Sequence, residues 1–201
     1  MDNRITLLEK FIFENSPGNI KTDIPLIIAQ EMVFISRPHL TNITSFTEIK
    51  GELKPHLGQC VQYRLQDYWK IENGKKLDYN ICGMEVDLKT TAPIVSRSAW
   101  CIQNACVGHP LILIHTNTST NYVKMGLTIA DPEHLRHHNK KGEIYYLNQK
   151  GIDKIYWLFE NAPLPSFEYV MSMPEQSLPN SIKLKYISKC EKPRILVKDF
   201  F

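Results

Sequence analysis

Residues 77–91 alternate between polar and apolar side chains on both sides of a glycine, and this pattern constrains the fold more than any other feature of the chain. Alternation with a period of two is typical of strands that bury one face. Because Cys82 and Gly83 lie at the centre of the segment, we predict two antiparallel strands, 77–82 and 84–91, joined by a tight turn. One face of this hairpin then belongs to the core.

The predicted turn fixes which side chains face one another across the hairpin. Asp78 lies opposite Asp87, and Asn80 lies opposite Glu85. Lys89 follows Asp87 on the same face, because side chains alternate along a strand. This face is therefore polar and carries three carboxylates. The opposite, apolar face is formed by Tyr79, Ile81, Met84, Val86 and Leu88.

The facing pair of Asp78 and Asp87 needs an explanation, because like charges directly opposite each other oppose folding. Two carboxylates ~4 Å apart repel each other by about 4 kcal/mol at an effective dielectric constant near 20. One explanation is an exposed, solvated hairpin in which Lys89 supplies a positive neighbour. The other is a divalent cation between the carboxylates, with a backbone carbonyl and waters completing an octahedron. Mg²⁺ suits that arrangement because it prefers oxygen ligands and retains water. The spacing alone fits both explanations.

The rest of the chain mixes helical and strand patterns. Apolar spacing predicts helices over 5–12, 24–34, 55–70 and 147–159, a helical turn over 133–138, and further strands over 111–115, 122–129 and 183–187. This mixture favours an α/β fold with a mixed central β-sheet flanked by α-helices. A length of 201 residues fits a single domain over 1–201.

Composition excludes several classes of protein. Charged residues make up 22% and hydrophobic residues 43%, as in ordinary globular domains, so disordered and fibrous classes are excluded. No apolar run approaches the ~20 residues of a membrane helix, and the first residues lack a leader pattern, so we expect a cytoplasmic protein without a membrane partner. The five cysteines lack the C-x-x-C spacing of a zinc ribbon, which favours reduced thiols.

Charge alone does not identify a partner. The net charge of +3 permits contact with a polyanion. One basic stretch fits both a phosphate-contacting segment and a solvated loop; it contains His134, Arg136, His137, His138, Lys140 and Lys141.

The spacing of Asp78 and the following Asp87-Leu88-Lys89 resembles the PD-(D/E)xK nuclease signature. With Tyr79, Ile81, Gly83 and Val86 included, the hairpin is similar to the active-site hairpin of NaeI-type restriction endonucleases. The similarity continues in order through 54–58, 99–100, 107–109, 147–151 and 157–158, so it covers about residues 50–165. It implies a restriction-endonuclease-like fold and Mg²⁺-dependent hydrolysis of phosphodiester bonds.

The resemblance also implies roles for individual residues. Asp78 and Asp87 are the expected Mg²⁺ ligands, and Lys89 is expected to hold or help deprotonate the attacking water and to contact the scissile phosphate. Leu77 replaces the proline of the signature, a change that many members share.

Three further polar residues are candidates for completing the site. Gln62 stands on the third predicted helix where the NaeI pattern has a glutamate, so it is a candidate for orienting a metal-bound water. Glu85 shares the polar face and is a candidate for tuning the metal or Lys89, and either Glu85 or Glu52 is an alternative source of the missing carboxylate.

Three functions follow from the resemblance. The first is a type II restriction endonuclease that cuts both strands of duplex DNA as a homodimer, since two-fold protein symmetry matches a palindromic site. The second is a repair nickase of the MutH type, which acts on one strand as a monomer. The third is a DNA-binding module of the same fold that has lost activity.

Overall fold

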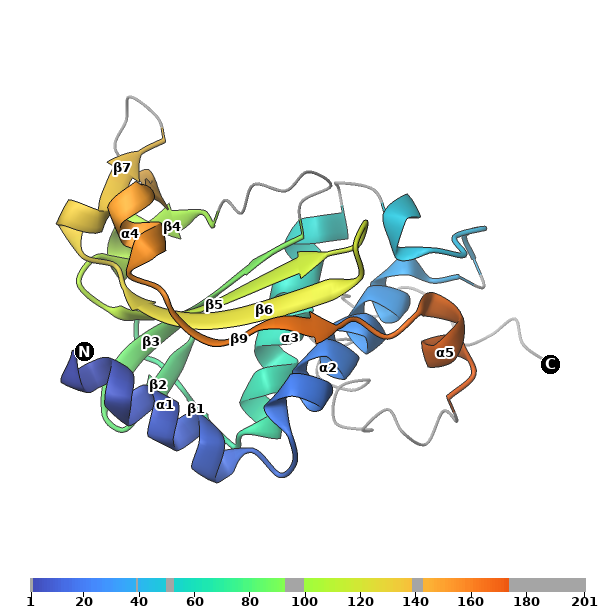
Figure 1. Cartoon of the computed structure of the whole chain (residues 1–201), viewed down its shortest axis with the longest axis horizontal. Helices are drawn as coiled ribbons and strands as arrows, with labels where there is room; N and C mark the ends of the chain where they lie inside the picture. Colours follow the sequence, from blue (N-terminus) through green and yellow to red (C-terminus); the bar gives the residue numbers. More distant parts are fainter. Residues whose placement is uncertain (1, 39, 50–52, 93–99, 139–142, 174–201) are drawn as a thin grey trace. The chain divides into compact units, whose positions relative to one another are not determined.

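The structure is a computed structural model, and it describes residues 2–38, 40–49, 53–92, 100–138 and 143–173. Its centre is a six-stranded sheet with the strand order β1-β2-β3-β5-β6-β9 (Figure 1). The strands are β1 (Glu72–Asn73), β2 (Tyr79–Ile81), β3 (Met84–Thr91), β5 (Pro110–Asn117), β6 (Tyr122–Ile129) and β9 (Tyr156–Pro163). Strands β3 and β5 are parallel and the other neighbours are antiparallel, so the predicted mixed sheet is confirmed.

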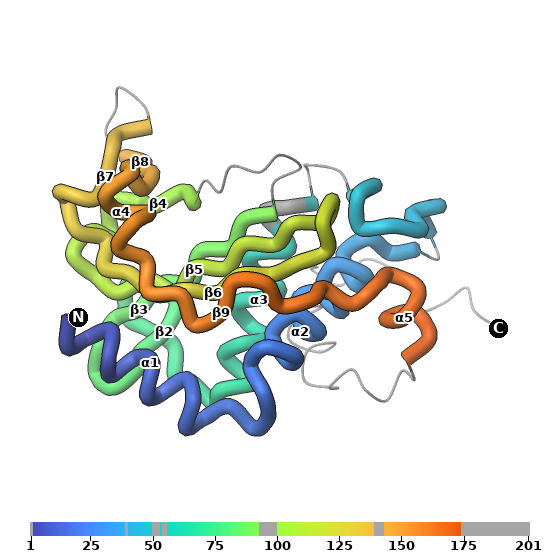
Figure 2. Tube along the Cα trace, viewed as in Figure 1, coloured from blue at the N-terminus to red at the C-terminus, as the bar shows by residue number. Residues whose placement is uncertain are grey.

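Three helices cover one face of this sheet (Figure 2). They are α1 (Asn3–Asn15), α2 (Ile20–Ser36) and α3 (Lys54–Tyr68). Helix α3 packs closely on β3, since a Cβ atom added at Gly58 would lie 2.9 Å from Thr90 Oγ1. The helices therefore bury the apolar face of the hairpin, where Tyr79, Ile81 and Val86 are each at most 1% exposed. The α/β fold with flanking helices is confirmed and is consistent with a restriction-endonuclease-like fold.

A second, three-stranded sheet has the order β4-β8-β7. It consists of β4 (Ile102–Gln103), β7 (Leu135–His137) and β8 (Ile144–Leu147), and it adjoins the short helices η3 (Asn104–Cys106), η4 (Pro132–His134) and α4 (Gln149–Asp153). Its apolar side chains share a buried cluster with Leu111 and Leu113 of β5, on the face of the main sheet that carries Asp87 and Lys89. The sequence patterns did not predict this small sheet.

Near the other end of the sheet, η1 (Phe46–Glu48) and α5 (Phe167–Met171) are joined by an aromatic contact. The rings of Phe46 and Phe167 meet edge to face, with centroids 5.4 Å apart. Across the described residues, no helix combines the length and the apolar character needed to cross a bilayer.

The predicted hairpin is confirmed in its register. Tyr79 pairs with Val86 and Asn80 pairs with Glu85, as a turn at Cys82 and Gly83 requires. Both turn residues have positive φ, 52° and 77°, as expected for the tight turns that match strand twist. Strands β3 and β6 coincide with the predicted ranges 84–91 and 122–129.

The predicted helix over 147–159 is wrong. Leu147 ends β8, α4 is a five-residue helix capped by Asn148, and Tyr156 begins β9. The run 155–159 is rich in aromatic and branched side chains, which also suit a half-buried strand, and pairing with β6 decides the outcome. Without tertiary contacts, short apolar runs are ambiguous between the two structures.

Other predicted boundaries shift. Helix α2 starts at Ile20, because the Asn19 side chain caps it, and Pro25 lies within the helix instead of at its entry. The predicted helical turn over 133–138 is confirmed only for η4, since 135–137 form β7. The predicted strand over 183–187 lies outside the described residues, so the single domain over 1–201 stays a prediction.

Candidate active site

Asp78 lies at the start of the hairpin, one residue before β2. Its Oδ2 atom accepts a hydrogen bond of 2.9 Å from the backbone N–H of Leu88 on β3. Continuing the register of β2 and β3 by one residue places Asp78 opposite Asp87, as the turn predicted. The hydrogen bond therefore holds the Asp78 carboxylate at the edge of β3, between Asp87 and Lys89.

Asp87 lies in the middle of β3 and is only 4% exposed. Its Oδ2 atom lies 2.6 Å from the ammonium of Lys89 in an ion pair. Burial, and then the charge of Asp87, raise the pKa of Asp78 to about 6. The two carboxylates therefore interact, and their repulsion is the feature that the sequence predicted.

Lys89 bridges the two sheets. Its Nζ atom contacts Asp87 and donates a hydrogen bond of 2.8 Å to Oε1 of Gln103 on β4. Burial alone would lower the pKa of Lys89, but the attraction of Asp87 outweighs it and the pKa is raised. Lys89 is therefore an ammonium at neutral pH, and its side chain is only 13% exposed.

Gln103 is a site residue that sequence reasoning missed. Its side-chain oxygen accepts hydrogen bonds from Lys89 and, at 3.8 Å, from the thiol of Cys106. Burial, followed by the charge of Asp87, raises the pKa of Cys106 to about 11, so this residue is a neutral thiol beside the acids. No local pattern identifies Gln103, because β4 has only two residues and belongs to the unpredicted sheet.

Glu85 lies on the polar face of β3, but its carboxylate turns to the loop before Asp78. It accepts hydrogen bonds of 2.9 to 3.0 Å from the backbone N–H groups of Lys75, Lys76 and Leu77. These three donors lower the pKa of Glu85 to about 2. The ionised Glu85 therefore holds in place the loop of residues 75–77, which directly precedes Asp78.

Gln62 lies on α3 and is half-buried. Its backbone carbonyl accepts a hydrogen bond of 2.7 Å from the hydroxyl of Tyr79, the residue after Asp78. This contact anchors the start of β2 to α3. Glu52 lies outside the described residues.

The residues present fit Mg²⁺, the cofactor that the resemblance implies. The buried carboxylate of Asp87 and the adjacent carboxylate of Asp78 are a pair of hard oxygen donors. Within the described ranges, no three side chains of histidine, cysteine, aspartate or glutamate gather as a metal site. Two carboxylates are therefore the side-chain ligands available, and Mg²⁺ commonly takes its other ligands from water and phosphate.

A family model described as restriction endonuclease NaeI matches residues 41–180. No curated protein matches the chain. The matched segment spans more than half of the chain and includes Asp78, Asp87, Lys89 and Gln103, together with the helix and the small sheet that enclose them. The chain therefore belongs to the NaeI restriction endonuclease family.

Proposed function

We propose that this protein is a type II restriction endonuclease that hydrolyses phosphodiester bonds at a specific site in duplex DNA, with Mg²⁺ held by Asp78 and Asp87. One observation carries the proposal. Asp87 is buried, and its carboxylate lies 2.6 Å from the Lys89 ammonium and beside a second acid, Asp78, at the hairpin of a restriction endonuclease family member. Such a cluster of buried charges costs folding free energy, and clusters of this kind are typical of functional sites.

The catalytic obstacles are the negative charge of the phosphodiester and the poor leaving group. When bound, Mg²⁺ polarises a phosphate oxygen and lowers the pKa of a coordinated water. Asp78 and Asp87 bind the cation. The pKa of Lys89 is raised beside Asp87, so Lys89 donates hydrogen bonds to the attacking water or the scissile phosphate and stabilises the added charge.

The surrounding residues position these three. Gln103 orients the ammonium of Lys89, and Glu85 holds the loop that carries Asp78. Gln62 supports β2 through its carbonyl, and its side-chain amide is proposed to orient a metal-bound water. A cytoplasmic location and a homodimer that spans a palindromic site belong to the same proposal.

The test is incubation of the purified protein with unmethylated phage DNA and Mg²⁺. Discrete fragments are the expected result. A smear contradicts sequence specificity, and nicked circles of a plasmid without linear product favour the MutH-type alternative. Binding to duplex DNA without any cleavage favours the inactive binding module.

A further inference from the structure

The two faces of the three-stranded sheet differ in chemistry. Leu135, Tyr145 and Leu147 belong to or pack against the apolar cluster beneath the sheet. Opposite partners in an antiparallel pair share a face, and neighbours along a strand alternate. Because Arg136 pairs with Tyr146, both residues lie on the other, outer face.

The side chains of this outer face gather around one aromatic ring. The guanidinium of Arg136 lies 5.7 Å from the ring centroid of Tyr146, and the ring of His138 lies 4.5 Å from it. The Cys101 thiol lies 3.6 Å from the Tyr146 hydroxyl. We name these four residues, Arg136, His138, Tyr146 and Cys101, the outer face.

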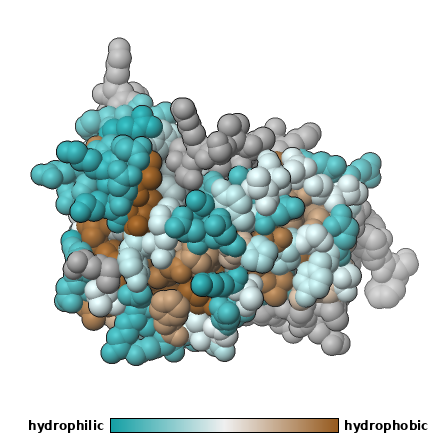
Figure 3. Space-filling view, viewed as in Figure 1, coloured by the Kyte–Doolittle hydropathy of each residue, from teal (hydrophilic) through white to brown (hydrophobic). Residues whose placement is uncertain are grey.

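The outer face carries a positive charge that is not paired with an acid in the part of the chain that the structure describes. Arg136 is exposed and forms no ion pair within the ranges that the structure describes. His138 is also exposed. Figure 3 shows hydrophilic residues covering the end of the molecule where β7 and α4 lie. A guanidinium, an imidazole and a phenol on one surface are donors that fit phosphate oxygens.

The same small sheet reaches the candidate active site. Gln103 pairs with Ile144, so these two side chains lie on the same face of the sheet. Ile144 and Tyr146 are two residues apart on β8 and therefore also share a face. The Gln103 side chain accepts a hydrogen bond from Lys89. One three-stranded element thus carries the exposed cation at one edge and the contact to the catalytic ammonium at the other. Only β8 separates β4 from β7 and neighbouring strands lie about 4.8 Å apart, so the two edges are about 10 Å apart and the backbone adjoining a scissile phosphate at Lys89 can extend to this surface.

We propose that the outer face binds the sugar–phosphate backbone of duplex DNA beside the scissile phosphate. This inference rests on the proposed function and deepens it by assigning a backbone-binding surface. Arg136 supplies the main charge, because its fork of N–H groups matches a phosphate. Tyr146 holds the guanidinium in place by stacking.

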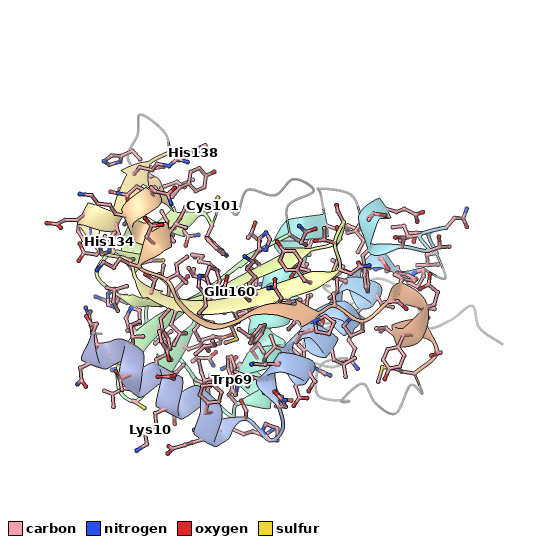
Figure 4. The ribbon with its side chains drawn as sticks, in the orientation of Figure 1. Lys10, Trp69, Cys101, His134, His138 and Glu160 are labelled. Carbon is pink, nitrogen blue, oxygen red and sulfur yellow. The ribbon has the colours of Figure 1, made fainter. Side chains whose placement is uncertain are left out.

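The first test compares charge removal on two sides of the molecule. Arg136→Ala is compared with Lys10→Ala, which removes a positive charge from α1, on the side away from Cys101 and His138 (Figure 4). Affinity for a random-sequence duplex is measured in Ca²⁺ at several salt concentrations. We expect Arg136→Ala to bind about five- to tenfold more weakly. The slope of the logarithm of the binding constant against the logarithm of the salt concentration should become shallower by about one, as expected for the loss of one phosphate contact. Lys10→Ala should bind like the unmodified protein. Equal behaviour of the two variants overturns the proposal.

The second test uses Cys101 as a built-in reporter. Cys101 and Cys82 are both exposed thiols, but Cys82 lies at the β2–β3 turn. Alkylation of each cysteine is followed by peptide mass spectrometry with and without saturating duplex in Ca²⁺. We expect duplex to slow alkylation of Cys101 about tenfold and to leave Cys82 unchanged. Unchanged Cys101 alkylation overturns the proposal, as does a failure to bind duplex.

The two proposals fail in distinguishable ways. Protection of Cys101 and weaker binding by Arg136→Ala, without any cleavage in Mg²⁺, support the outer face and contradict the nuclease. Cleavage that proceeds in Mg²⁺ while Cys101 stays unprotected supports the nuclease and contradicts the outer face.

Discussion

Among the described residues, buried acidic side chains lie in two regions, the β2–β3 hairpin and the helix layer formed by α1, α2 and α3. The two regions differ in what surrounds the acid. In the hairpin, Asp87 is 4% exposed and lies beside Asp78 and Lys89. In the helix layer, Glu31 on α2 is 2% exposed, and the charge that acts on it is that of Arg64 on α3. Asp87 Oδ2 lies 2.6 Å from the Lys89 ammonium, whereas Glu31 Oε2 has no hydrogen bond among the described residues.

The surroundings decide how each region relieves its charge. Burial raises the pKa of Glu31 to about 7 against the attraction of Arg64, so a proton neutralises this acid near neutral pH. Arg64 donates a hydrogen bond of 3.0 Å to the side chain of Gln30, the residue that precedes Glu31 on α2. In the hairpin, two acids face each other beside an ammonium, which is a setting for a divalent cation. The comparison teaches that burial of an acid does not by itself identify a catalytic site.

A large effect on cleavage is expected for Lys89→Ala. This change removes the ammonium beside Asp87 and leaves both carboxylates, so we expect the rate of Mg²⁺-dependent cleavage to fall by roughly 10³-fold. Binding of duplex in Ca²⁺ should persist. Lys10→Ala on α1 is the control and should cleave normally. A cleavage rate within tenfold of the unmodified protein would remove Lys89 from the chemistry.

A smaller effect is expected for Gln103→Ala. Loss of the 2.8 Å hydrogen bond frees the ammonium of Lys89, so kcat should fall by about 10- to 100-fold while KM changes little. Gln149→Ala is a matched control, because this exposed glutamine lies on α4 and bonds Asp153. Lysine labelling gives a second readout, in which Lys89 should react faster in Gln103→Ala. Unchanged labelling together with unchanged kcat contradicts the positioning role.

For the buried acid of the helix layer, Glu31, we expect a substitution to change stability without changing activity. The pKa of Glu31 is raised in the folded state, so its contribution to stability is fully present below about pH 4.5 and is lost as the pH rises through about 7. Glu31→Gln should therefore increase the free energy of unfolding by about 1 to 2 kcal/mol at pH 8. The gain should vanish near pH 4. Equal stability of the two proteins at pH 8 disproves the assignment of a strained acid.

The smallest effect expected is stabilisation by metal. Ca²⁺ at ten times its dissociation constant should add about 1.4 kcal/mol to the free energy of unfolding and raise Tm by ~3 to 5 °C. The increase should persist in Glu31→Gln and disappear in Asp87→Asn, because the hairpin holds the two facing carboxylates that are proposed to bind the cation. An increase that survives in Asp87→Asn would place the cation elsewhere.

The sequence predicts the hairpin well for a local reason. Alternation around Gly83 fixes which residue faces which, and this register alone brings Asp78 and Asp87 together. Helix α3 and strands β3 and β6 are equally predictable from periodicity, because each buries one continuous face or lies wholly within the core.

The small sheet and its contribution to the site are not predictable in this way. Strand β4 has two residues and β7 has three, too few for any period to be detected. Gln103 reaches Lys89 only because tertiary packing brings β4 over β5. Glu85 is charged and lies on the polar face of β3, as expected for a site residue. Its carboxylate instead accepts hydrogen bonds from the backbone N–H groups of residues 75–77, and this contact depends on the conformation of the loop.

The most direct test of the central claim is the single-turnover cleavage rate of Asp87→Asn and Glu31→Gln in Mg²⁺, with melting curves to confirm that both variants are folded. Each variant replaces one buried carboxylate with an amide of the same shape. We predict no detectable cleavage by Asp87→Asn and an unchanged rate for Glu31→Gln. Undiminished cleavage by a folded Asp87→Asn protein would contradict the assignment of the hairpin as the metal-binding catalytic site.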